Sequence, residues 1–252
     1  MGLRLYPKES NEYNFYKSIY EKQNLIQVQN RIDKYSKLNN GIYSMQEALS
    51  MLNEFIDPSD PDLDQPNLIH AYQSAERARQ EYPSNKQLQV CALIHDIGKI
   101  LFTFGEDTEF IVGDTFVLGH KIPDKVVCYD SIDKNIINNY NSIYTSNCGL
   151  DKVTLSFGHD EYLYIVLTGN KNHKLEQKYI DIIRYHSFYP WHTNGCYREL
   201  MSDKDLSLLK NVIEFNKYDL YSKEDTNFVL TEEIKTYYNL LLEDIFPEKL
   251  NW

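Results

Sequence analysis

Apolar residues recur at roughly helical spacing along most of the chain, with polar residues between them. Over residues 12–36 the pattern contains no Pro or Gly and predicts one long amphipathic helix. Ser44 and Glu47 match a capping box, which predicts a second helix reaching about Phe55. The same periodicity predicts further helices over 66–82, from 84 through 100, and over 158–169, 174–188, 203–216 and 231–243.

Between about 105 and 153 this pattern is interrupted by Gly and Pro residues and by polar clusters. Only the short segments 125–130 and 152–157 resemble strands. We therefore expect an all-α fold, a helical bundle with a loop-rich middle segment. Residues 1–42 are expected to form an N-terminal helix and tail, and residues 43–252 the main domain of a single compact unit.

Composition and charge disfavour several classes of function. The 252 residues carry 37 acidic against 26 basic side chains, a formal net charge of -11 that disfavours nucleic acid and anionic membranes as partners. No apolar leader or long apolar run occurs, so we expect a cytoplasmic protein. The four cysteines lie far apart without a CxxC pair, which favours free thiols. Without a GxGxxG or P-loop pattern, neither NAD nor flavin is expected.

A polar cluster interrupts an otherwise apolar predicted helix. The sequence ALIHDIGKI sets His95, Asp96 and Lys99 in a hydrophobic run, with His95 and Lys99 four residues apart on one helical face. Asp96 is expected about 100° further around the helix. Such a group cannot be buried without partners, so it must be paired, bound to a metal or exposed. A core histidine beside a local Asp96–Lys99 ion pair explains the cluster equally well.

Four more imidazole or carboxylate side chains stand in similar apolar or aromatic surroundings, namely His70, His159, His186 and Asp219. Imidazole and carboxylate together suit iron, manganese or zinc, and the lack of nearby thiolates argues against a softer metal. Six such side chains exceed what one ion with open positions needs, which favours two metals. The two oxygens of Asp96 could bridge ions about 3.5–4 Å apart.

The order His70, His95-Asp96, Asp219 resembles the metal motif of the HD-domain superfamily. The neighbouring segments narrow the resemblance to the inositol oxygenase family, from about Tyr43 to Trp252: DPSDPDLDQPN, HDIGKI, VGDTF, CGLD, SFGHDEY, RYHSFYPWH and EFNKYDLYSK. Membership of that family implies a helical bundle of HD type over residues 43–252. It also implies a non-haem di-iron oxygenase of inositol catabolism.

The resemblance implies two iron ions, a mixed-valent Fe(II)/Fe(III) pair, with O2 as co-substrate. The first iron would take His70, His95, Asp96 and Asp219. The second would take His159 and His186, with Asp96 as the bridge. The implied reaction is the four-electron ring cleavage of myo-inositol to D-glucuronate by a monomer.

The same resemblance assigns Lys99 a catalytic role beside Asp96, because its ammonium can stabilise a substrate alkoxide. Further contacts with the cyclitol substrate are assigned to Asp57, Gly113, Asp114, Ser187 and Lys223. Two neighbours of the ligands, Asp160 and His192, are expected to play lesser roles. We interpret Asp160 as solvated or as a hydrogen-bond partner, and His192 as a packing group.

The first 40 or so residues depart from the family pattern, which places an arginine in a Phe-Arg-x-Tyr lid. Arg4 lies in LRLYPK and Arg31 in QNRIDK, and neither matches, so we expect the lid to be shortened or replaced.

Three alternatives to the family reaction remain open. They are oxidation of another polyol or phosphonate-like substrate on the same scaffold, an HD-type metal phosphohydrolase, and a non-catalytic metal-binding protein.

Overall fold

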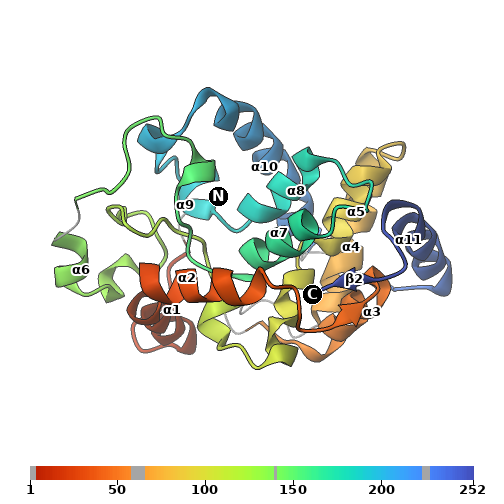
Figure 1. The fold of residues 1–252 in the computed structure, drawn as a ribbon. Helices are drawn as coiled ribbons and strands as arrows, with labels where there is room; N and C mark the ends of the chain where they lie inside the picture. Colours follow the sequence, from red (N-terminus) through yellow and green to blue (C-terminus); the bar gives the residue numbers. More distant parts are fainter. Residues whose placement is uncertain (1–3, 58–65, 139–140, 223–227) are drawn as a thin grey trace.

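A computed structural model describes residues 4–57, 66–138, 141–222 and 228–252 of the protein (Figure 1). Helices dominate these residues, and the predicted all-α fold is confirmed. The α-helices are α1 (Asn11–Lys22), α2 (Leu25–Tyr35), α3 (Met45–Met51), α4 (Asn67–Glu81), α5 (Lys86–Ile94), α6 (Lys134–Asn138), α7 (His159–Gly169), α8 (Gln177–Tyr185), α9 (Tyr189–His192), α10 (Asp203–Ser222) and α11 (Glu232–Ile245). Short 3-10 helices are η1 (Leu52–Glu54), η2 (Ile97–Phe104), η3 (Thr108–Phe110), η4 (Tyr129–Ser131), η5 (Leu150–Lys152) and η6 (Arg198–Leu200).

The expectation of one long helix over residues 12–36 is wrong, because the chain breaks at Gln23 and Asn24. The Asn24 side chain caps α2 by accepting hydrogen bonds from the first free amides of that helix. The Gln23 side chain is buried and bonds to the backbone of Glu109 and Phe157. Asn24 therefore starts the new helix, while Gln23 holds the bend between α1 and α2 against Glu109 and Phe157. By contrast, the predicted capping box at Ser44 is confirmed.

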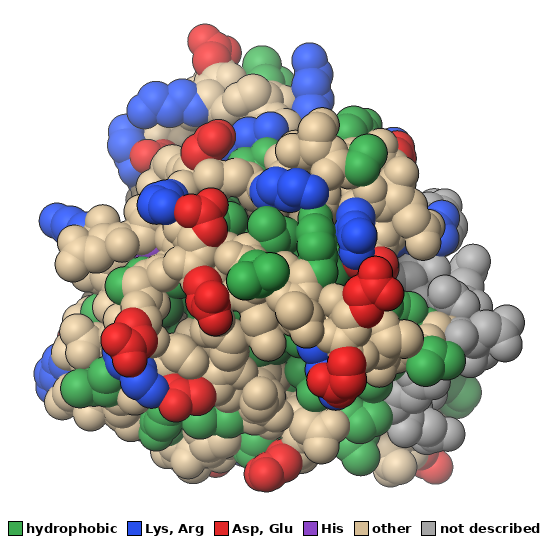
Figure 2. Space-filling view, turned by 90° about the vertical axis from the view of Figure 1, so that its right-hand side faces the viewer, with side chains coloured by type: hydrophobic (Ala, Val, Ile, Leu, Met, Phe, Trp, Pro, Cys, Tyr) green, Lys and Arg blue, Asp and Glu red, His purple; other side chains and the backbone are tan. Residues whose placement is uncertain are grey.

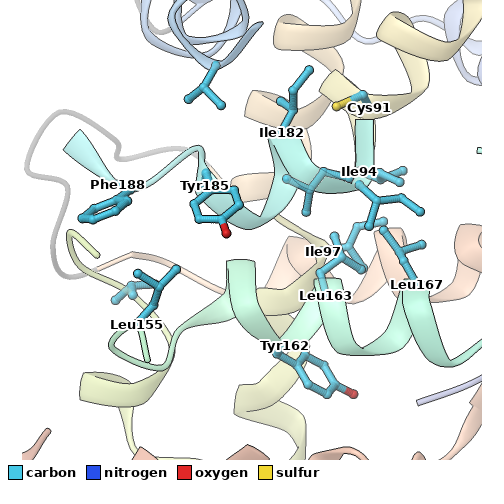
Figure 3. Close-up of a cluster of buried hydrophobic side chains, with 14 of the residues drawn as sticks. Cys91, Ile94, Ile97, Leu155, Tyr162, Leu163, Leu167, Ile182, Tyr185 and Phe188 are labelled. Atoms are coloured by element: carbon cyan, nitrogen blue, oxygen red, sulfur yellow. The ribbon is translucent and has the colours of Figure 1, made fainter. Parts of the chain in front are cut away.

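Helices α4, α5, α7, α8 and α10 form the centre of the molecule. Helix α4 packs along α5, α7 packs on α8 and on η2, and α10 contacts α4 and α8. Figure 3 shows the apolar interface, where Ile94 and Ile97 meet Leu163 and Leu167 of α7 and Ile182 of α8. These buried contacts fix the ends of α5, α7 and α8 relative to one another.

The two segments that resembled strands, 125–130 and 152–157, are not strands. The first forms turns that lead into η4, and the second contributes only an isolated bridge between Val117 and Leu155. A two-stranded antiparallel sheet instead joins β1 (Ile42–Tyr43) to β2 (Leu250–Asn251). It places the fully buried Trp252 indole beneath the chain near Tyr43, where Nε1 donates to the Tyr43 carbonyl at 3.2 Å.

Figure 2 shows acidic and basic side chains interspersed over one face, with small apolar areas between them. No helix in the described parts of the chain is long and apolar enough to cross a membrane. All four cysteines are free thiols, as predicted. Burial raises the pKa of the Cys91 thiol, and it raises that of Cys128 to about 11. Both thiols are therefore protonated at neutral pH.

An ion pair anchors α2 to the segment after η2. Both Arg31 Nε and Nη2 donate to Glu106 Oε1, at 3.1 and 2.9 Å, and the Tyr35 hydroxyl donates to Glu106 Oε2 at 2.8 Å. Burial acts to raise the pKa of Glu106, but the hydrogen bonds from Tyr35 and Arg31 outweigh it and lower the pKa below its ordinary value. The carboxylate therefore stabilises the fold in its ionised form.

We expect Glu106→Gln to lower the free energy of unfolding at pH 7 by about 1–3 kcal/mol, because Arg31 and Tyr35 lose charge-assisted bonds. A carboxylate with a lowered folded-state pKa stabilises above its unfolded pKa of about 4.3. The difference between variant and wild type should therefore begin to shrink below that value and be lost as pH falls through the lower pKa of the folded state. Urea unfolding between pH 3 and 7 measures it. Glu21→Gln, in an exposed pair with Lys17, is the control and should stay near wild type.

Candidate metal centre

Six buried imidazole and carboxylate side chains converge where the central helices meet. They are His70 of α4, His95 and Asp96 just after α5, His159 at the start of α7, His186 just after α8, and Asp219 of α10. The structure thus brings together every residue that the sequence predicted as a metal ligand. Around the two oxygens of Asp96 they form two groups, and the ligand atoms of His95 also lie close to those of Asp96 and His186.

The first group joins His70, His95 and Asp219. His70 Nε2 lies 2.9 Å and His95 Nε2 3.6 Å from Asp219 Oδ1. Asp96 Oδ2 faces the same two histidines, 3.9 Å from His70 Nε2 and 3.6 Å from His95 Nε2. The ligand atoms of His70, His95 and Asp219 lie within 4.8 Å of one another, as a shared ion requires.

The second group joins His159 and His186 around the other oxygen of Asp96. Asp96 Oδ1 lies 3.1 Å from His159 Nε2 and 3.6 Å from His186 Nε2. The two Nε2 atoms are 3.2 Å apart. Each oxygen of the Asp96 carboxylate therefore faces its own pair of histidines, so both oxygens are placed where they could bind metal.

The histidines are oriented by the backbone so that Nε2 points into the centre. For His95, His159 and His186, Nδ1–H donates to a main-chain carbonyl at 2.8, 2.7 and 2.7 Å respectively. This fixes the proton on Nδ1 and leaves Nε2 with a free lone pair, the state in which histidine binds metals. The accepting carbonyls belong to Ala92, Ile111 and Ile183.

Gly98 allows the two groups to approach. A Cβ atom on Gly98 would overlap the carbonyl group of His159 and lie 2.9 Å from its Cα. Any side chain at this position would therefore push the start of α7 away from η2. The glycine between Asp96 and Lys99 is what lets His159 reach Asp96.

Opposing effects of burial and charge act on the carboxylates. Burial acts to raise the pKa of Asp96, but Lys99 and His95 outweigh it and hold the pKa well below its usual range. The same balance, with His70 and His95 as partners, lowers the pKa of Asp219. Both side chains are therefore anionic at neutral pH, and the same two carboxylates raise the pKa of His95. Carboxylate oxygens and imidazole nitrogens form a donor set that suits a transition metal such as iron, once the metal has displaced the Nε2 protons.

Lys99 lies beside this centre with its ammonium group enclosed. Its Nζ is 3.0 Å from Asp96 Oδ2, 2.9 Å from Asp57 Oδ2 and 2.9 Å from Asn67 Oδ1. Burial acts to lower the pKa of Lys99, but Asp57 and Asp96 outweigh it and raise the pKa, so the group stays charged. Sequence reasoning missed Asn67, which is an amide at the start of α4.

The geometry of the Lys99 contact differs from the predicted one. The chain after Asp96 continues as the 3-10 helix η2, which has about three residues per turn. Residues three apart therefore share a face, and Lys99 stands over Asp96 instead of four residues along an α-helix from His95. The Asp96–Lys99 ion pair and the metal-binding arrangement coexist, so the two interpretations of ALIHDIGKI are not exclusive.

Other residues predicted to contact substrate lie around the second histidine group. Gly113, with φ of +110°, and Asp114 stand on the loop after η3. Ser187 Oγ is 3.5 Å from His159 Nε2. Asp57 reaches the centre through Lys99, as described above. Lys223 lies outside the described residues.

The N-terminal segment also reaches this loop. The Arg4 guanidinium bonds to Asp114, and the Tyr16 hydroxyl donates to Asp114 Oδ1 at 3.0 Å. Arg4 also lies over the Tyr189 ring. The sequence did not predict a role for Arg4 in the site, because the residues around it do not match the Phe-Arg-x-Tyr motif. Arg31, in contrast, binds Glu106 away from the centre.

Two neighbours of the predicted ligands are fully enclosed. His192 Nε2–H donates to the His186 carbonyl at 2.9 Å, and burial lowers the pKa of His192 to about 4, so it is neutral. Asp160 is buried and accepts a hydrogen bond from the Thr115 hydroxyl at 2.7 Å. Of the two interpretations given to Asp160, the hydrogen-bond partner is right and the solvated side chain is wrong.

Comparison with known proteins assigns the chain to a family. The family model of myo-inositol oxygenase matches residues 9–252. An inositol oxygenase of Danio rerio is 40% identical over 247 residues, 95% of this chain and 88% of the relative. Inositol oxygenase 1 of Arabidopsis thaliana is 41% identical (94% and 79%), and an inositol oxygenase of Mus musculus 38% identical (95% and 86%). With nearly its whole length matched, the chain belongs to the myo-inositol oxygenase family.

Proposed function

We propose that the protein is an inositol oxygenase that uses O2 to open the ring of myo-inositol, yielding D-glucuronate and water. Relatives that match almost the entire chain carry the name inositol oxygenase. The observation that carries the proposal furthest is the Asp96 carboxylate, each of whose oxygens faces a separate histidine pair. That arrangement supports two ions joined by one carboxylate.

The proposed cofactor is a mixed-valent pair of iron ions. His70, His95, Asp96 and Asp219 would hold the first iron, and His159, His186 and Asp96 the second. Iron supplies, when bound, the activation of O2 that amino-acid side chains cannot perform. The donor set of nitrogen and oxygen atoms without thiolates supports this choice of metal.

Lys99 is the proposed catalytic side chain. Its position against Asp96 and Asp57, with a raised pKa, keeps a fixed positive charge next to the proposed metal pair. Such a charge stabilises the oxygen of a substrate hydroxyl as its proton leaves. Because the ammonium is already held in place, little reorganisation is needed when the substrate binds.

The remaining proposed contacts would orient the ring of the polyol. The carboxylates of Asp57 and Asp114 can accept hydrogen bonds from hydroxyls, and the backbone of Gly113 is proposed as a further contact. The φ of +110° at Gly113 favours glycine and sets the course of the loop that carries Asp114. Ser187 and Lys223 are proposed to contact other hydroxyls. An analogue that lacks one hydroxyl would leave a buried partner unpaired, so these contacts would also give specificity.

Charge at the centre disfavours the phosphohydrolase alternative. Lys99 and Arg4 are each paired with carboxylates, Asp57 and Asp96 for the first and Asp114 for the second. A dianionic phosphoester would therefore meet carboxylates, without a free cationic cluster among the residues described here. A neutral polyol fits this mixture of hydrogen-bond acceptors and enclosed cations better.

The proposal predicts that iron-loaded, partly reduced protein consumes O2 when myo-inositol is added and forms glucuronate in equal amount. Oxygen uptake and a glucuronate assay on the same sample measure this. Zinc-loaded protein is the control, because zinc has no redox chemistry and should give no turnover. If both irons are bound but no oxygen is consumed, myo-inositol is not the substrate, and phosphatase turnover in the same sample would point to the alternative.

A further inference from the structure

Thr115 lies at the junction of three segments of the candidate site. Its hydroxyl donates to Asp160 Oδ2 at 2.7 Å, and its amide donates to the Ser187 carbonyl at 2.9 Å. Both Thr115 and Asp160 are buried, with 3% and 2% of their surfaces exposed. The residues beside them, Asp114 and His159, are a proposed substrate contact and a proposed metal ligand.

The Asp160 carboxylate is fixed at the first turn of α7. Its Oδ1 accepts from the Glu161 amide at 2.9 Å, while Oδ2 accepts from Thr115. A carboxylate at this end of a helix is also stabilised by the free amides and the helix dipole. Asp160 is thus a rigid acceptor against which Thr115 is held.

The same turn of α7 holds the other end of the loop. The Ile111 carbonyl accepts two hydrogen bonds from His159, one from its amide at 2.8 Å and one from Nδ1–H at 2.7 Å. The loop 111–115 is therefore attached to α7 at both ends, by Ile111 to His159 and by Thr115 to Asp160. Gly113 and Asp114 lie between these two attachments.

We propose that Thr115 and Asp160 are positioning residues, which hold the Asp114 loop in register with His159 and Ser187 and so set the affinity for the polyol. This inference rests on the proposed function for the identity of the ligand. Neither Thr115 nor Asp160 is itself a proposed metal ligand or a proposed substrate contact. Their effect is transmitted through Asp114 and Ser187.

The expected effect depends on the Asp160 carboxylate, which accepts hydrogen bonds from both the loop and α7. Thr115→Val keeps the shape of the side chain but leaves Asp160 Oδ2 buried without its donor, so the loop loses its attachment to α7 at the Thr115 end and keeps only the one at Ile111. A loop free to shift by a fraction of an ångström no longer presents Asp114 to a hydroxyl at hydrogen-bond distance. Loss of binding that is equal in the ground state and the transition state raises KM and leaves kcat unchanged.

The test compares Thr115→Val, Thr115→Ser and the control Thr168→Val in the iron-loaded protein. Thr168 is also on α7, and its hydroxyl bonds to the Tyr164 carbonyl at 2.7 Å, away from the loop. We expect Thr115→Val to raise KM for myo-inositol about tenfold or more, with kcat changed by less than about twofold. Thr115→Ser, which restores a hydroxyl, should recover most of the loss, and Thr168→Val should match wild type.

Two further measurements on the same variants separate the possible outcomes. Iron content should stay at the wild-type level in all of them, and hydrogen exchange of the peptide 111–118 should quicken in Thr115→Val alone. An unchanged KM and unchanged exchange in Thr115→Val would overturn the positioning role, as would an equal loss in Thr115→Ser. If the wild type neither binds nor oxidises myo-inositol, the proposed function fails, while the exchange result still decides whether the pair holds the loop.

Discussion

Asp96→Asn is expected to reduce bound metal from two ions per chain to one or fewer, and to lower turnover by at least about 10³-fold. The Asp96 oxygens serve different histidine pairs, since Oδ2 faces His95 at 3.6 Å and Oδ1 faces His159 at 3.1 Å. An asparagine amide has one oxygen acceptor and no charge, so it cannot join both pairs. Lys99 would also lose one of its two carboxylate partners.

Metal analysis together with oxygen uptake measures this effect. The matched control is Asp181→Asn on α8, where the carboxylate accepts from Gln177 at 2.8 Å and does not reach the centre. The control should keep both ions and full turnover. Two tightly bound ions and more than about a tenth of wild-type turnover in Asp96→Asn would contradict a shared carboxylate.

The second large effect is expected on stability, from Trp252→Ala. We expect the free energy of unfolding to fall by about 3–5 kcal/mol, because the change removes a fully buried indole and leaves a cavity. For a chain of this size the thermal midpoint should fall by roughly 6–20 °C. The variant also loses the bond from the indole to the Tyr43 carbonyl, which supports the contact between β1 and β2.

Urea unfolding of the metal-free protein isolates this effect from metal binding, which would add its own stabilisation. Leu240→Ala is the control, because that leucine of α11 is 60% exposed and its removal should cost less than about 0.5 kcal/mol. A loss below about 1 kcal/mol in Trp252→Ala would mean that the indole contributes little packing in solution.

The helices could be predicted from the sequence because their apolar faces repeat with the helical period over many residues. The break between α1 and α2 could not, since it depends on Asn24 acting as a cap and on Gln23 bonding to backbone more than 80 residues away. The short sheet of β1 and β2 was missed for the same reason. Two residues per strand carry no periodic signal, and their pairing is a long-range contact.

The candidate site could be anticipated to a larger extent. His70 and His95 were conspicuous because polar side chains in apolar helices need partners, and the six residues singled out on that ground do meet in space. Their assignment as iron ligands stays a prediction. Thr115 and Arg4 could not be found in this way, because a threonine near glycines and an arginine near the N-terminus look ordinary without their contacts.

The close approach at Gly98 constrains the order in which such a centre can be built. The carbonyl group of His159 occupies the space that a Cβ atom would take. A helical protein that holds only the first group of ligands could not gain the second by acquiring two histidines, because a larger residue two positions after the shared aspartate would keep them out of reach. Engineering a two-metal site into a one-metal relative would therefore have to begin with a glycine, before any new ligand is introduced.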